Sequence, residues 1–262
     1  MGSLFEREGF LAVQMLRWEQ RRRNSTVGAR RNRADPEPSL LGSFFLIEQC
    51  VIKEGMERAM VRKDIEKHST PFVKGSFGKP DLNRVEREGH VFIVKDVQGK
   101  HFILRWTLGL WLIHKEWKVY SRLVGIRGIP RPIERIDRFA FATEFVPGRP
   151  VSRGEPLPSS FFIELGSILG QVHAKGVVHM DLRHKGNILI SEKGEPFLID
   201  FNSSFAFGEK GILRRYLFPL LRWVDYGGLL KLKKRVSPTF LTPDETAFLK
   251  KFDRIRRLWI FN

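Results

Sequence analysis

Residues 177–190 of the chain are Val-Val-His-Met-Asp-Leu-Arg-His-Lys-Gly-Asn-Ile-Leu-Ile, and residues 198–201 are Leu-Ile-Asp-Phe. Apolar and β-branched runs flank a polar loop in the first stretch, and residues 191–195, Ser-Glu-Lys-Gly-Glu, are typical of a turn. This order predicts a β-hairpin that carries Asn187 before one strand and Asp200 after the other. Both side chains are therefore expected at the same edge of the hairpin.

Asp181, Asn187 and Asp200 have the side chains that phosphoryl transfer from ATP requires. One carboxylate orients the attacking hydroxyl, while an amide oxygen and a second carboxylate hold the Mg²⁺ ions that neutralise the phosphates. The alternative is a surface loop with solvated charges and a buried Asp-Phe turn. That alternative would suffice for a single aspartate, but the ordered set with its apolar framing favours a phosphoryl-transfer site.

The same order of residues resembles the catalytic loop and metal-binding motif of the protein-kinase-like superfamily. The resemblance implies that Asp181 is the catalytic base, that Asn187 and Asp200 are metal ligands, and that ATP and Mg²⁺ are the cofactors. We also expect Arg183 to contact the transferred phosphate or a bound anion, and His179 to hold the loop by hydrogen bonds.

The motif departs from the family at two points. The family places four residues between the catalytic Asp and the Asn, whereas this chain has the five residues 182–186, and we expect Gly186 to absorb the extra length in a tight turn. Asn202 follows Phe201 where protein kinases have Gly. This second change argues against a flipping, regulated activation segment but leaves metal binding by Asp200 in place.

Two upstream segments resemble parts of a kinase amino-terminal lobe. Residues 91–97 form a strand-like run that contains Lys95, similar to the strand whose Lys grips the α- and β-phosphates. Apolar residues recur at helical spacing in 114–123, which predicts an amphipathic helix with Glu116 near one border as the partner of Lys95. A solvated strand end and an ordinary surface carboxylate remain open alternatives for these two residues.

The segments expected to contact the nucleotide are a loop and a hinge. Gly75 and Gly78 lie in a loop that could cover the phosphates, although a loop with only two glycines could equally be a plain turn. Residues 129–146 predict two strands joined at 137–138. The stretch from Thr143 to Gly148 resembles the hinge between kinase lobes, where the backbone groups of Glu144 and Val146 would meet adenine.

The resemblance implies an α+β, bilobal protein-kinase-like fold with a small β-rich N-terminal lobe and a shortened helical C-terminal lobe. We expect a basic, partly disordered N-terminal extension over 1–68, an N-terminal lobe over 69–146 and a C-terminal lobe with a basic amphipathic tail over 147–262. A helix is expected from Ser159 to Lys175, with His173 as a packed or capping residue and not a catalyst. Residues 201–262 contain no Ala-Pro-Glu motif, so the chain is similar in plan to RIO-type and bacterial lipopolysaccharide core kinases.

Composition adds an expectation about partners. The formal net charge is +17, which implies an anionic partner. Residues 212–235 mix basic with aromatic and aliphatic side chains, which suits an anionic membrane surface, although a basic-faced helix packed on the lobe is an equally open alternative. Nucleic acid is less favoured because no recognition motif accompanies the charge. The single Cys50 and the lack of a long apolar run predict a cytoplasmic protein, peripheral at the inner face of the membrane if the tail binds lipid.

We therefore expect an ATP- and Mg²⁺-dependent kinase that transfers the γ-phosphate to a hydroxyl of a protein Ser/Thr or of a lipid-linked sugar. The alternative is a catalytically inactive kinase-like module that binds anionic membrane or nucleic acid. The presence of the complete Lys95, Asp181, Asn187 and Asp200 set argues against that alternative.

Overall fold

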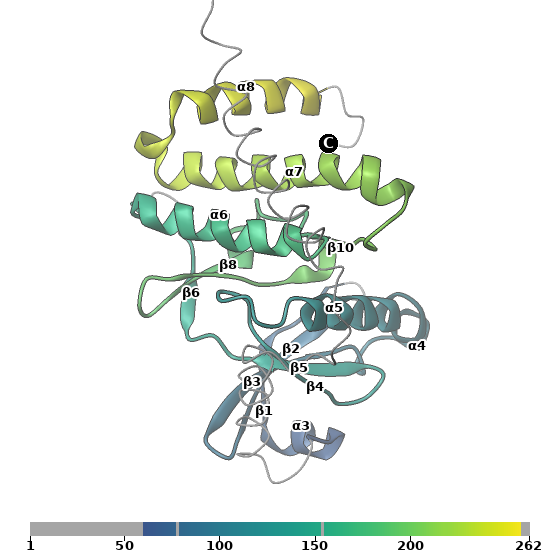
Figure 1. Ribbon diagram of the computed structural model, residues 1–262. Coiled ribbons are helices and arrows are strands. Elements are labelled where there is room, and N and C mark those ends of the chain that lie inside the picture. The colour runs from purple at the N-terminus through teal and green to yellow at the C-terminus, as the bar shows by residue number, and fades with distance from the viewer. Residues whose placement is uncertain (1–59, 77–78, 153–154, 258–262) are drawn as a thin grey trace, which may run out of the picture. The chain divides into compact units, whose positions relative to one another are not determined.

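The computed structural model describes residues 60–76, 79–152 and 155–257, which all belong to one unit spanning 53–262. Its mixed α+β architecture contains a five-stranded antiparallel sheet with the order β1-β2-β3-β5-β4 (Figure 1). The strands are β1 (Ser69–Val73), β2 (Asp81–Arg87), β3 (His90–Asp96), β4 (Pro132–Arg135) and β5 (Ala140–Glu144). The two strands expected within 129–146 are confirmed as β4 and β5. The expected N-terminal arginine-rich arm and Gly78 lie outside the described residues.

The two faces of this sheet have different partners. Alternate residues such as Val85, Phe92 and Val94 pack with Met60 and Ile65, the latter on helix α3 (Arg62–His68). Residues 60–68 therefore pack against the sheet, whereas the sequence predicted them within the N-terminal extension over 1–68. The opposite face, which carries Lys95 and its cross-strand neighbour Phe141, lies toward helix α5 (Leu110–Arg122).

Helix α5 is longer than its apolar spacing predicted. It begins at Leu110 and follows α4 (Phe102–Leu104) and a π-helical turn, η1 (Arg105–Gly109). Gly109 allows this approach to the sheet, because a Cβ there would lie 3.2 Å from the side chain of Val97. The buried face of α5 consists of Ile113, Glu116, Val119 and Tyr120.

The remaining elements form two small sheets and three long helices. Strands β6 (Gly148–Pro150), β8 (Ile188–Ser191) and β9 (Pro196–Leu198) form one sheet, and β7 (Val177–Val178) pairs with β10 (Phe205–Ala206). Helices α6 (Ser159–Ala174), α7 (Ile212–Val236) and α8 (Pro243–Arg257) lie in successive layers (Figure 1). Three short 3₁₀ turns complete the described residues: η2 (Lys185–Asn187), η3 (Phe201–Ser203) and η4 (Pro238–Phe240).

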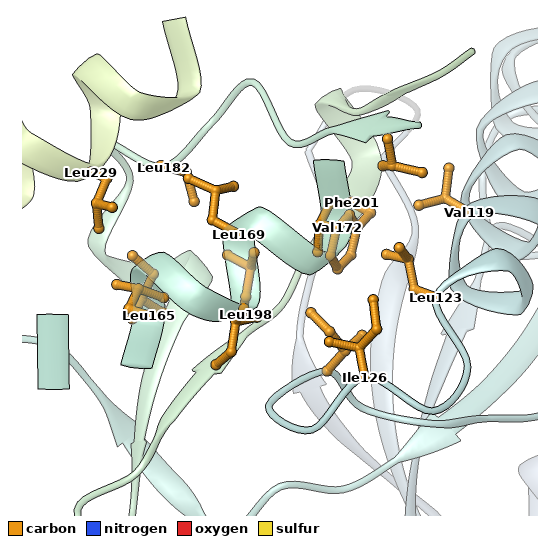
Figure 2. Close-up of a cluster of buried hydrophobic side chains, with 14 of the residues drawn as sticks. Val119, Leu123, Ile126, Leu165, Leu169, Val172, Leu182, Leu198, Phe201 and Leu229 are labelled. Carbon is orange, nitrogen blue, oxygen red and sulfur yellow. The ribbon is translucent and has the colours of Figure 1, made fainter. Parts of the chain in front are cut away.

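One apolar cluster joins α5, α6 and α7 beneath the loops that follow β7 and β9. Figure 2 shows Phe201 in this cluster beside Val172 of α6, with Val119 and Leu123 on the side of α5. Leu182 and its neighbour Leu229 on α7 belong to the same cluster. The residues around the motif are thus buried in the main core. A division of this unit into two lobes remains a prediction.

No helix in the described part of the chain is both long enough and apolar enough to cross a membrane.

Candidate active site

The β8–β9 hairpin places two of the predicted metal ligands at one edge. Ile188 pairs with Leu198, and the Ile199 N–H donates to the Asn187 carbonyl at 2.9 Å. Asn187 therefore immediately precedes one strand, and Asp200 follows the other by two residues. The predicted hairpin and the shared edge are confirmed.

Asp181 and Asn187 are joined across the loop between β7 and β8. The Asn187 amide nitrogen donates to the Asp181 carbonyl at 2.9 Å and to its Oδ2 at 3.1 Å. These bonds occupy the amide nitrogen, so the amide oxygen remains for a ligand. The extra loop residue is accommodated by the 3₁₀ turn η2, in which the Asn187 N–H bonds to the His184 carbonyl. The expectation that Gly186 lies in a tight turn here is confirmed, although the residue that adopts positive φ in this loop is Met180, at 69°.

Buried His179 links this loop to the end of β9. Its Nε2 lies 3.0 Å from the Ile199 carbonyl, while its Nδ1 accepts from the Asp181 N–H at 3.3 Å. This pair of bonds requires the neutral tautomer with a proton on Nε2. Burial lowers the pKa of His179, although the carboxylate of Asp225 opposes the change, so the neutral form agrees with the bonding. The prediction that His179 holds the loop is confirmed.

The carboxylate of Asp225 on α7 anchors the start of the same loop. It accepts from the His179 N–H at 2.7 Å, from the Met180 N–H at 2.6 Å and from His173 Nε2 at 2.9 Å. Asp225 is 1% exposed, so each of these bonds is made away from water. The bonds also hold Met180 in its left-handed conformation, which is costly for a residue with a Cβ. Sequence reasoning missed Asp225, and it predicted His173 correctly as a packing residue.

The second half of the site is a buried group of charges between β3 and α5. Lys95 Nζ donates to Glu116 Oε1 and lies 3.5 Å from Asp200 Oδ1. The same Glu116 oxygen accepts from the Phe201 N–H at 3.1 Å. Glu116 is 0% exposed and Lys95 is 5% exposed, so the alternatives of a surface carboxylate and a solvated strand end are excluded.

The pKa shifts in this group follow from burial and charge. Burial alone would lower the pKa of Lys95, but the carboxylates of Glu116 and Asp200 raise it above its ordinary value. Burial raises the pKa of Glu116, and the Lys95 ammonium opposes that rise. Burial also acts to raise the pKa of Asp200, but Lys95 and the Asn202 N–H lower it overall. Near neutral pH Asp200 is thus an anion that faces a protonated Lys95.

Three contacts from α5 hold the turn that contains Asp200. The Asp200 N–H donates to the Tyr120 hydroxyl at 3.3 Å, Glu116 binds the Phe201 N–H, and Lys115 Nζ donates to the Asn202 carbonyl. Asp200 itself has φ 61° and ψ 78°, a left-handed conformation that such contacts must stabilise. The side chain of Phe201 is fully buried and packs against the ring of Tyr120, with centroids 5.2 Å apart.

Asn202 orients the carboxylate of Asp200. Its amide nitrogen donates to Asp200 Oδ1 at 2.8 Å, and its backbone N–H approaches the same oxygen at 3.4 Å. Both bonds and the approach of Lys95 involve Oδ1, which leaves Oδ2 as the oxygen for a metal. A Gly at position 202 could supply only the backbone bond.

The remaining predicted residues lie apart from this cluster. The Gly75 N–H donates to Asp81 Oδ1 at 2.8 Å, and Lys100 Nζ donates to the Gly75 carbonyl at 2.7 Å, which secures the base of the loop. Arg183 has an exposed side chain, and its carbonyl accepts from Arg235 Nη1 at 3.3 Å. Gly75 and Arg183 therefore have no contact with Lys95, Asp181, Asn187 or Asp200 among the hydrogen bonds and ion pairs of the described residues.

The segment expected to form the hinge is fixed to its neighbours through the backbone. The Glu144 N–H donates to the Arg131 carbonyl at 2.9 Å, and the Phe145 N–H approaches the Val91 carbonyl at 3.4 Å. Val146 is buried. The side chain of Glu144 points to Arg131, with Oε2 3.2 Å from its Nε. Any contact of this segment with adenine would therefore come from backbone atoms.

The donors at the hairpin edge are suitable for Mg²⁺. This ion prefers oxygen ligands and usually takes only one or two carboxylates from the protein, with water and phosphate oxygens completing its shell. Asp200 and Asn187 provide a carboxylate and an amide oxygen of this kind. Within residues 60–76, 79–152 and 155–257, no cluster of three or more His, Cys, Asp or Glu side chains could hold a metal ion by itself.

The chain matches no protein-family model, and no curated protein shows significant similarity to it.

Proposed function

We propose that this protein is an ATP- and Mg²⁺-dependent phosphotransferase with a bilobal, protein-kinase-like fold. The observation that carries the proposal is the convergence of Lys95, Glu116 and Asp200 next to the hairpin edge that holds Asn187 and Asp181. These residues are far apart in the sequence, and the buried Lys95 ammonium faces the carboxylates of both Glu116 and Asp200. A protonated Lys beside two carboxylates and an amide oxygen suits a nucleotide phosphate with its metal.

Each residue then has a defined role. Lys95, positioned by Glu116, would bind the α- and β-phosphates, and Asn187 with Asp200 would hold Mg²⁺, which neutralises charge on the phosphate oxygens. Asp181 would orient the acceptor hydroxyl and accept its proton. The hydroxyl oxygen forms a bond to the γ-phosphorus while the bond to the β-bridging oxygen breaks, leaving ADP. The backbone of Glu144 and Val146 would receive adenine, and the loop with Gly75 would cover the phosphates.

The acceptor is a hydroxyl group of a protein Ser/Thr or of a lipid-linked sugar. The exposed side chain of Arg183, one residue beyond Leu182 in the catalytic loop, is available to an anionic acceptor or to the transferred phosphate. The proposed class of enzyme resembles RIO-type and lipopolysaccharide core kinases, because residues 201–262 contain no Ala-Pro-Glu motif. An inactive kinase-like binding module would keep the same fold but would not require Asp181.

A thermal-shift experiment tests nucleotide binding. A ligand at about one hundred times its Kd stabilises the native state by about 2.7 kcal/mol, which is roughly 5–10 °C for a chain of this size. Mg²⁺ with ATP should produce such a shift. Asp200→Ala should remove its magnesium-dependent part, whereas the control Asp253→Ala, at an α8 carboxylate that pairs with Lys231, should not. Indifference of the wild-type protein to both nucleotide and metal would rule out the proposal.

A transfer experiment then separates the enzyme from the inactive module. Labelled γ-phosphate is followed from ATP into the protein and lipid fractions of a cell extract, with wild-type protein and Asp181→Asn in parallel. Label that enters either fraction with wild type alone supports the enzyme and identifies the acceptor class. A nucleotide-dependent thermal shift without transfer would favour the binding module.

A further inference from the structure

The N-terminal half of α7 exposes a continuous row of apolar side chains. Its members recur at one, three and four residues, so they share one face of the helix. Three of them are more than 60% exposed, which is unusual for large apolar residues grouped together. We call this row the apolar stripe, and it consists of Ile212, Leu213, Tyr216, Leu217 and Leu220.

The opposite face of the same helix is packed and cannot exchange places with the stripe. Phe218 and Leu221 form a small core with Val178 and Phe207, next to the β7–β10 pair. Phe218 is 4% exposed, and the rings of Phe207 and Phe218 are 5.2 Å apart. Rotation of the helix to hide the stripe would expose this core, so the stripe is held toward the outside.

Basic residues outnumber acidic residues beside the stripe. Residues 209–224 contain Lys210, Arg214, Arg215 and Arg222, and the one acidic residue among them is Glu209. Lys210 and Arg215 are exposed, whereas Arg214 lies over the ring of Phe218. The only acidic residue of α7, Asp225, is buried. This surface therefore combines apolar area with the exposed positive charges of Lys210 and Arg215.

The second half of α7 differs, although its sequence is equally basic. Lys231 Nζ lies 2.6 Å from Asp253 Oδ1, and Lys233 Nζ lies 2.8 Å from Glu245 Oε2, so both charges are compensated by α8. Arg235 binds the Arg183 carbonyl. The expectation that all of 212–235 faces lipid is thus too broad. Lys234 and Arg235 are exposed, but only the first half combines exposed basic residues with a row of exposed large apolar side chains.

We propose that the apolar stripe and its basic border dock the protein on an anionic membrane surface, with α7 lying in the plane of the interface. An amphipathic helix binds such a surface by burying its apolar face at the headgroup boundary while Lys and Arg attract anionic lipids. A nucleic acid duplex would satisfy the charge but would leave the stripe exposed. This proposal does not depend on the phosphotransferase activity.

If the proposed function also holds, docking would influence the choice of acceptor. The helix that carries the stripe also anchors the catalytic loop through Asp225, and Gly228 lies so close to the loop that a Cβ there would be 3.1 Å from Leu182 Cβ. A membrane bound at the N-terminal half of α7 would therefore lie at a fixed distance and orientation from Asp181. This favours a hydroxyl on a membrane-embedded molecule, such as a lipid-linked sugar, over a hydroxyl in solution.

Co-sedimentation of the full chain with vesicles tests the docking. Vesicles of phosphatidylcholine alone are compared with vesicles that also contain phosphatidylglycerol, at low and high salt. The wild-type protein should prefer the anionic vesicles, and replacement of Leu213, Tyr216 and Leu217 by Ser should weaken partitioning by about tenfold or more. Arg215→Gln should weaken it about fivefold at low salt, the equivalent of about 1 kcal/mol.

A matched control changes charge in the second half of the helix. Lys231→Gln with Lys233→Gln removes two positive charges but should change partitioning by less than about twofold, because these charges already have acidic partners. All variants should keep the wild-type response to Mg²⁺ and ATP, whatever that response is. The proposal would be overturned if wild type and the stripe variant partitioned equally, or if wild type showed no preference for anionic vesicles. It would also be overturned if duplex DNA, added as a competitor, displaced the protein from the vesicles.

Discussion

Replacement of Asp225 by Asn is the most informative single perturbation of this structure. The two side chains are nearly the same size, but the amide has one acceptor oxygen where the carboxylate has two. In the wild-type protein Oδ2 accepts from His173 and from the His179 N–H, while Oδ1 accepts from the Met180 N–H. The better orientation of the amide keeps the first two bonds and turns its own N–H groups toward Met180.

The cost follows from these contacts. One hydrogen bond to a charged acceptor is lost, and the Met180 N–H and an amide N–H are left facing each other in a site that is 1% exposed. Each buried unpaired donor costs about 1–3 kcal/mol, so we expect Asp225→Asn to lower the free energy of unfolding by roughly 2–5 kcal/mol. Met180 also loses the bond that holds its positive φ, so the start of the loop between β7 and β8 should relax and, under the proposed function, phosphate transfer should slow.

Urea unfolding followed by tryptophan fluorescence measures the loss of stability, and phosphate transfer is measured where both proteins are folded. Asp253→Asn is the matched control, because it is the same substitution at a carboxylate that is 41% exposed and paired with Lys231. Exposed pairs contribute about 0–1 kcal/mol, so this control should resemble wild type in both assays. Equal losses below about 1 kcal/mol for the two variants would refute the anchoring role of Asp225.

Three further outcomes are expected. Asp181→Asn should lower turnover by roughly a hundredfold while retaining the ATP-dependent thermal shift, and equal rates would remove Asp181 from its role as base. Gly227→Ala should destabilise the protein by roughly 1–3 kcal/mol, because the new Cβ would lie 2.3 Å from a ring atom of Phe252. Gly170→Ala on α6 should instead stabilise the protein by about 0.5–1 kcal/mol, because its new Cβ would have nothing within 4 Å. Urea unfolding that ranked these two variants in the opposite order would contradict the packing of α7 on α8. Burial lowers the pKa of His179 from 6.5 in the folded chain, so the unfolded state binds a proton first as the pH falls. Stability should then decline below about pH 6.5 by up to about 1.4 kcal/mol per pH unit, and His179→Gln should flatten this decline in unfolding experiments between pH 7.5 and 5.

Local patterns were sufficient to predict the hairpin and the strands around it. Alternating apolar runs and a turn between them determine the β8–β9 pairing, and the register then brings Asn187 and Asp200 to one edge. The burial of Glu116 was less predictable, because it lies at the border of the apolar face of α5. Its role depends on Lys95, which is 21 residues away along the chain but joined to it in the structure.

Long-range partners explain what the sequence did not reveal. Asp225 is separated from Met180 by 45 positions, and nothing near it in the chain indicates that it accepts backbone N–H groups. One signal was present, since Asp225 is the only acidic residue between Glu209 and Asp244. The difference between the two halves of α7 could not be predicted either. Both halves are basic in sequence, and only the structure shows that acidic residues of α8 pair with Lys231 and Lys233.

The turn that contains Asp200 is held rigidly by its contacts and does not act as a hinge. Swinging it outward would break its bonds to Tyr120 and Glu116, at about 0.5–1.5 kcal/mol each or more where charge is involved, and would expose Phe201, at about 1.5–3 kcal/mol. A conformer that costs roughly 4 kcal/mol or more is occupied by about one molecule in a thousand or fewer. The carboxylate of Asp200 is therefore oriented by the protein alone. Under the proposed function, the binding of metal and nucleotide would not have to wait for this turn to rearrange.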